Sequence, residues 1–133
     1  MRAKTYCPVC QLDFVIAEEN FFEGSVVLCR ICGAKIEITA VGPTIEGRKW
    51  AQKPEEEIVE RVDTFASLRG YVFNEHRELV MEGLMGKHDL YGDFYCPCRF
   101  ENTAETLCPC LEARKNYVKK HGECRCGLFV LPG

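Results

Sequence analysis

Ten cysteines dominate this chain of 133 residues, and every one of them lies in a close pair. Two Cys-x-x-Cys pairs lie near the N-terminus and three Cys-x-Cys pairs near the C-terminus: Cys7/Cys10, Cys29/Cys32, Cys96/Cys98, Cys108/Cys110 and Cys124/Cys126. No apolar signal segment precedes the first pair, so we expect a cytoplasmic protein, in a compartment that keeps thiols reduced. In that setting, paired cysteines indicate metal binding or redox catalysis in preference to structural disulfides.

The change in cysteine spacing divides the chain into two parts. Residues 1–42 hold the first group, residues 43–53 are expected to be a linker because Gly42 and Pro43 open it, and residues 54–133 hold the second group. The net charge of −3 provides no attraction for nucleic acid, and no run of about 20 apolar residues exists to span a membrane. Neither nucleic acid nor a membrane is therefore expected as a partner.

The two parts differ in their expected secondary structure. Short β-branched and apolar runs predict strands in the first part, at residues 14–16, 25–28 and 35–39. In the second part, Pro54 and three glutamates predict the start of a helix that ends at Gly70, and Asn74 is a candidate cap of a second helix. A third helix is expected from Leu111 to Lys120. The sequence thus predicts a small β domain followed by a mainly α domain.

The two Cys-x-x-Cys knuckles, Cys7/Cys10 and Cys29/Cys32, supply four thiolates with the spacing of a tetrahedral metal site. Such a site holds zinc in a zinc ribbon, where the metal replaces a missing core, or a single iron in a rubredoxin-like centre. Zinc is favoured because Gln11 stands where rubredoxin-type knuckles usually have glycine. The prediction is a zinc-ribbon or rubredoxin-like domain with zinc or iron bound by these four cysteines.

The second group reads Cys-Pro-Cys-Arg from Cys96, Cys-Pro-Cys from Cys108, and Cys-Arg-Cys-Gly-Leu-Phe from Cys124. Six cysteines are two more than one cubane iron–sulfur cluster needs, so a surplus pair is available to form a disulfide. From about residue 54 to 132 this pattern, preceded by Glu82-Gly83-Leu84 and Lys87-His88, resembles the catalytic chain of ferredoxin:thioredoxin reductase. By that resemblance we expect an enzyme, an iron–sulfur disulfide reductase.

The resemblance implies a role for each of these six cysteines. Four would bind a [4Fe–4S] cluster and two would form a redox-active disulfide beside it: Cys96, Cys108, Cys110 and Cys124 as ligands, and Cys98 with Cys126 as the disulfide. Cys98 is the sulfur expected to attack the target disulfide, and Arg99 next to it would favour the thiolate. Electrons would arrive singly from a ferredoxin-like donor and leave to a thioredoxin-like protein.

One position departs from the family pattern. Arg125 stands between the closing cysteines, where the family commonly has a histidine thought to aid proton transfer, and arginine does not exchange its proton near neutral pH. His121 is close in sequence and is expected to take that catalytic role, with His88 as a second candidate. Two other functions stay open at this point: a noncatalytic zinc-binding adaptor, and a cluster-bearing thiol redox sensor.

Overall fold

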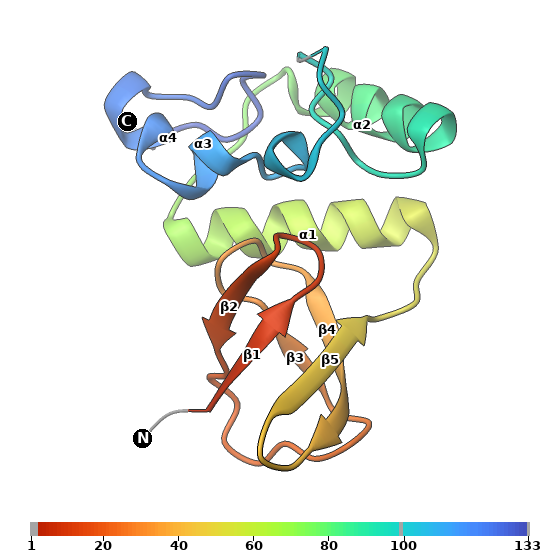
Figure 1. Cartoon of the computed structure of the whole chain (residues 1–133). Coiled ribbons are helices and arrows are strands. Elements are labelled where there is room, and N and C mark those ends of the chain that lie inside the picture. The colour runs from red at the N-terminus through yellow and green to blue at the C-terminus, as the bar shows by residue number, and fades with distance from the viewer. Residues whose placement is uncertain (1–2, 99, 133) are drawn as a thin grey trace.

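The computed structural model describes residues 3–98 and 100–132, and it contains both strands and helices (Figure 1). Two antiparallel sheets form the N-terminal part. The first pairs β1 (Lys4–Cys7) with β2 (Leu12–Val15), and the second has the order β3-β4-β5, formed by Val26–Leu28, Lys35–Val41 and Ile45–Lys49. Strands β2, β3 and β4 overlap the three runs in which the sequence predicts strands.

Strand β5 lies within the segment that the sequence predicts to be a linker. It pairs antiparallel with β4, and its last residue, Lys49, is opposite Ile36. Gly47 makes the pairing possible, because a Cβ at this position would lie only 2.6 Å from Ile36 Cγ2. Glycine inside a strand marks such a close approach, although in sequence it reads as a break. The β part therefore extends to Lys49, and only residues 50–53 connect it to the first helix.

Helix α1 (Pro54–Arg69) begins and ends where the sequence predicts. Pro54 is in its first turn, where the missing N–H costs no hydrogen bond, and three glutamates lie near the positive end of the helix dipole. Gly70 ends the helix in the left-handed conformation, with φ 74°. The apolar buried residues recur at helical spacing: Ile58, Val62, Phe65 and Ala66.

Helix α2 (Arg77–Tyr91) follows after a short connection. The N-cap of α2 is His76, which makes no side-chain cap hydrogen bond, so Asn74 does not cap the helix as expected. The Oδ1 of Asn74 instead accepts the backbone N–H of His76 at 2.9 Å, in the turn that precedes the helix. Gly92 ends α2 in the left-handed conformation, with φ 86°. A single 3-10 turn, η1 (Ala104–Thr106), precedes the second Cys-x-Cys pair.

The single helix expected from Leu111 to Lys120 is instead two short helices, α3 (Leu111–Arg114) and α4 (Tyr117–His121). Lys115 leaves the helical conformation, with φ −95° and ψ −129°, and the carbonyl of Arg114 accepts a hydrogen bond from Arg69 of α1 instead. A tertiary contact thus interrupts the helix. The chain as a whole is therefore a mixed α and β protein. Its second part is not mainly α either, because irregular segments join the short helical elements that follow α1 and α2.

Figure 1 shows α1 lying between the β part and a layer that contains α2, α3 and α4. One hydrophobic core lies in the β part and includes the first cysteine group with Phe14 and Ile36. The other core joins α1 to Phe94, Phe129 and three cysteines of the second group. No helix among the described residues has both the length and the apolar character needed to cross a membrane.

Candidate functional site

Four cysteine sulfurs of the β part converge, two from each knuckle. Their Sγ atoms all lie within 4.8 Å of one another and all four residues are buried: Cys7, Cys10, Cys29 and Cys32. The sulfur of Cys7 is 3.8 Å from that of Cys32, and the sulfur of Cys10 is 3.8 Å from that of Cys29. The two knuckles therefore face each other across one small volume.

This arrangement fits a tetrahedral metal ion. Four thiolates bound to one ion at ~2.3 Å lie ~3.8 Å from each other, which matches the observed separation of 3.8 Å in both pairs. Gln11 adopts a left-handed φ of 61°, so the first knuckle closes although glutamine replaces glycine. Hydrogen bonds from the thiols of Cys29 and Cys32 lower the pKa of Cys10. The same hydrogen bond raises the pKa of Cys29, because the thiol of Cys29 keeps the proton that it shares with Cys10. A cation would displace the shared protons and bind all four sulfurs.

The second cysteine group surrounds an enclosed cavity. Five of its cysteines line this cavity, along with apolar side chains that include Leu84 and Phe129: Cys96, Cys108, Cys110, Cys124 and Cys126. The first four of these cysteines are each at most 7% exposed. They come from three segments of the chain, since Cys96 follows α2, Cys108 and Cys110 lie between η1 and α3, and Cys124 follows α4. Folding thus collects four buried thiols around one apolar space.

Backbone hydrogen bonds hold the first two Cys-x-Cys pairs side by side. The N–H of Cys96 donates to the carbonyl of Thr106 at 2.7 Å, and the N–H of Cys108 donates to the carbonyl of Phe94 at 2.9 Å. An isolated bridge between Tyr95 and residue 107 lies between these two bonds. The positions of the Cys96 and Cys108 side chains therefore follow from main-chain pairing between residues 94–96 and residues 106–108.

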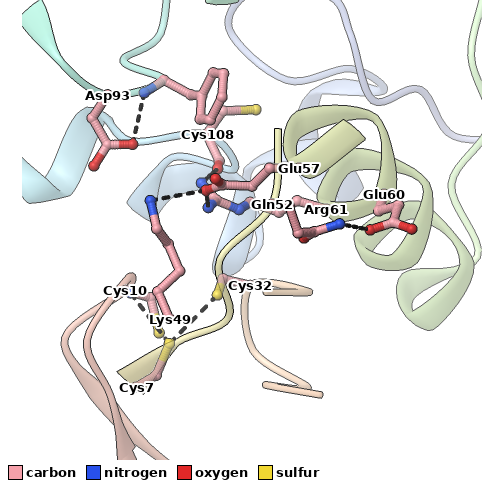
Figure 2. A network of polar contacts seen from close by, with 11 residues as sticks. Cys7, Cys10, Cys32, Lys49, Gln52, Glu57, Glu60, Arg61, Asp93 and Cys108 are labelled. Carbon is pink, nitrogen blue, oxygen red and sulfur yellow. Dashed lines mark hydrogen bonds and ion pairs between the residues drawn. The ribbon is translucent and has the colours of Figure 1, made fainter. Parts of the chain in front are cut away.

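The chemistry of the cavity suits an iron–sulfur cluster. Burial raises the pKa of the Cys108 and Cys110 thiols, so both retain their protons at neutral pH unless a cationic centre replaces them. Arg61 of α1 adds positive charge nearby, and its Nη1 donates to the Cys108 carbonyl at 3.5 Å. Figure 2 shows Arg61 held in turn by Glu57, which also pairs with Lys49 at 3.1 Å. Four buried thiols in an apolar shell are a donor set that fits a [4Fe–4S] cluster.

The remaining cysteine of this group, Cys98, is exposed, and Cys126 is half-buried. Their sulfurs and that of Cys96 all lie within 4.8 Å of one another. A surface groove is lined by Cys98 and Cys126 together with seven other residues: His76, Leu79, Val80, Pro97, Glu123, Arg125 and Gly127. Cys126 lines both this groove and the enclosed cavity, so it lies between the buried thiols and the surface. Arg99 lies outside the described residues.

The three histidines lie in different surroundings. His121 is exposed at the end of α4, where its ring is 4.2 Å from that of Tyr117, and Tyr117 in turn lies under the guanidinium of Arg125 at 5.3 Å. His88 stacks on a phenylalanine of the core, with ring centroids 4.7 Å apart. His76 lines the groove with Cys98, although sequence reasoning did not single it out. It is 22 residues before Cys98 in the sequence, so no local spacing connects the two.

Comparison with known protein families identifies the family to which the second part of the chain is similar. Residues 49–133 match the family model described as the ferredoxin thioredoxin reductase catalytic beta chain. This match covers α1, the cysteine cavity and the groove, and it begins at the last residue of β5. No curated protein matches the chain.

Proposed function

Because the chain belongs to the ferredoxin thioredoxin reductase catalytic beta chain family of oxidoreductases, we propose that it is an iron–sulfur disulfide reductase acting between a ferredoxin-like donor and a thioredoxin-like protein. The observation that carries this proposal is the position of Cys126, which lines both the enclosed cavity and the groove that contains Cys98. A disulfide between Cys98 and Cys126 would therefore be accessible to a substrate on one side and adjacent to a buried cluster on the other.

The proposed cluster ligands are Cys96, Cys108, Cys110 and Cys124. Their support is that all four are buried, that all four line one cavity, and that they occupy the ligand positions of the family pattern. When bound, a [4Fe–4S] cluster supplies the capacity to take up electrons one at a time, which a two-electron disulfide reduction requires when its donor is a ferredoxin. The side chains of Leu84 and Phe129 would keep water from the ligand sulfurs.

Cys98 is the proposed attacking residue because it is the exposed member of the pair. Its thiolate attacks one sulfur of the target disulfide, the target S–S bond breaks, and the other target sulfur leaves as a thiolate. The thiolate of Cys126 then attacks Cys98, which releases the remaining target thiol and leaves a Cys98–Cys126 disulfide. Two electrons from the donor and two protons return this disulfide to two thiols.

The protons need a group that titrates near neutral pH, which histidine provides. His121, the residue expected from sequence, contacts Tyr117, which lies under the guanidinium of Arg125, and Arg125 lines the groove. His76 lines the groove itself and joins His121 as a proposed proton-transfer residue.

For the N-terminal site we propose one zinc or one iron ion bound by Cys7, Cys10, Cys29 and Cys32, since the four-thiolate geometry suits either metal. A cytoplasmic location stays a prediction, based on the ten paired cysteines and a compartment that keeps thiols reduced.

The experiment that tests the proposal measures iron, acid-labile sulfide and zinc in protein purified without oxygen, alongside reduction of a thioredoxin disulfide. About four iron and four sulfide per chain are expected, with a further zinc or iron in the N-terminal site. Cys98→Ser should retain the iron, the sulfide and the visible absorption but lose reductase activity, whereas Cys108→Ser should lose the cluster. Zinc without sulfide, even after attempted reconstitution, would favour a noncatalytic zinc adaptor. A loaded cluster without turnover would favour a redox sensor.

A further inference from the structure

A buried arginine connects the two cysteine centres directly. Arg114, the last residue of α3, is 8% exposed. Its Nε donates to the carbonyl of Pro109 at 3.0 Å, and its Nη1 donates to the carbonyl of Cys10 at 3.3 Å. Pro109 is the residue between Cys108 and Cys110, and Cys10 belongs to the first knuckle of the N-terminal site. One guanidinium thus holds the backbone of both centres, across 104 positions of sequence.

A second arginine makes a parallel connection to the other knuckle. Arg69, at the end of α1, donates from Nη2 to the carbonyl of Ile31 at 3.3 Å, and Ile31 lies between Cys29 and Cys32. Its Nη1 donates to the carbonyl of Arg114 at 3.0 Å. Each knuckle of the N-terminal site is therefore hydrogen-bonded through an arginine to the segment that begins at Cys108.

The contact between the two parts is also close at Gly33, the residue after the second knuckle. A Cβ at this position would lie 2.8 Å from the carbonyl oxygen of Arg61 and 2.9 Å from the nitrogen of Phe65, both in the backbone of α1. Backbone lies against backbone here, so a movement of this knuckle cannot be absorbed by a flexible side chain. The N-terminal site therefore rests on a rigid surface of the second part.

We propose that metal binding in the N-terminal site and cluster binding in the second site are cooperative, with Arg114 as the positioning residue that couples them. The cluster half of this inference rests on the proposed function of Cys108 and Cys110. Without metal, the four thiols of the N-terminal site lose the ion that closes the knuckles, and the orientation of the Cys10 carbonyl is no longer defined. The guanidinium of Arg114 then loses an acceptor, and its other hydrogen bond, to Pro109, no longer has a fixed anchor.

The planar guanidinium is the chemical feature that makes this coupling specific. Its N–H bonds at Nε and Nη1 point in fixed directions, so the guanidinium fixes the orientation of the two carbonyls relative to each other. A lysine ammonium also has enough donors for both carbonyls, but its N–H groups rotate about a flexible stem, so it would not hold the two carbonyls at a fixed angle. Because linkage between two binding sites is reciprocal, the cluster should tighten metal binding by the same factor by which the metal tightens cluster binding.

The test uses the full chain with Zn²⁺ in the N-terminal site. Zinc affinity is measured by competition with a chromogenic chelator, once with the cluster reconstituted and once without it. We expect the cluster-loaded protein to hold Zn²⁺ about tenfold more tightly, the effect of one hydrogen bond from a charged donor. In Arg114→Met this ratio should fall to about one. Arg77→Met, which removes a half-buried arginine paired with Asp63 and touching neither centre, should leave the ratio unchanged.

A second measurement separates this inference from the proposed function. In cluster-free protein, removing Zn²⁺ should speed hydrogen exchange at the backbone N–H groups of Cys108 and Arg114, and this acceleration should be absent in Arg114→Met. If the chain binds no cluster, the proposed function fails and the exchange experiment alone decides the coupling. Should Arg114→Met not fold, Arg114→Lys is expected to show the same loss of coupling. A ratio near one in the unmodified chain, or an unchanged ratio in both Arg114 variants, would overturn the inference.

Discussion

Replacing Gly33 with alanine should destabilise the protein by an amount that the structure allows us to divide into two contributions. The first is conformational, because Gly33 has φ +86° and an L-residue there costs about 1–2 kcal/mol. The second is steric, because the new Cβ would lie 2.8 Å from the Arg61 carbonyl oxygen and 2.9 Å from the Phe65 nitrogen. These two atoms form an i to i+4 hydrogen bond of α1, so neither yields easily, and overpacking of this kind costs about 1–3 kcal/mol.

The expected total is a loss of about 2–5 kcal/mol in the free energy of unfolding, a large fraction of the about 5–15 kcal/mol typical of a protein. Urea unfolding monitored by the fluorescence of the single tryptophan, Trp50, measures it. Gly92→Ala is the matched control, since Gly92 also has φ +86° but has no atom within 4 Å of its Cβ position. It should lose only the conformational contribution. If Gly33→Ala lost no more stability than Gly92→Ala, the close seating of the N-terminal site on α1 would be refuted.

Three further predictions follow from the site and its surroundings. Chemically reduced Cys126→Ser should accumulate a mixed disulfide between Cys98 and its target, visible as a mass increase under non-reducing conditions; release of the target at the normal rate would reverse the proposed roles of the two cysteines. His76→Asn should lower kcat for thioredoxin reduction by about 10²-fold with the cluster absorption unchanged, and a larger effect of His121→Asn would assign proton transfer to His121 instead. Glu57→Ala should cost about 3–5 kcal/mol in thermal or urea unfolding, because it leaves the guanidinium of Arg61 buried without its 2.5 Å partner. Glu57→Gln should cost less, and equal losses in the two variants would argue against an ionic contribution.

The parts of this protein that sequence predicts well depend on neighbours along the chain. The proline, the glutamates and the glycine that delimit α1 act within one or two helical turns, so its bounds are readable before folding. The halves of the four-thiolate site are also predictable from neighbouring residues, because each Cys-x-x-Cys knuckle forms its own turn. Folding is needed only to bring the two knuckles together. The grouping of the last six cysteines came from a motif resemblance, and the structure places five of them around one cavity and Cys98 at the surface.

The first helix, the two Cys-x-x-Cys knuckles and the family could thus be predicted from the sequence, because each of them depends on patterns of residues that are close together along the chain. The pairing of residues 45–49 with β4 came only with the tertiary structure, since Gly47 is explained by the close approach of Ile36 and of the Glu37 backbone on that neighbouring strand. The tertiary structure also decided that the third helix breaks at Lys115, and that Arg114 reaches Cys10, because in both cases a hydrogen-bond partner comes from a distant part of the chain. Local propensity carries no information about such partners, since they are supplied only when the β part, α1 and the cysteine loops pack against one another.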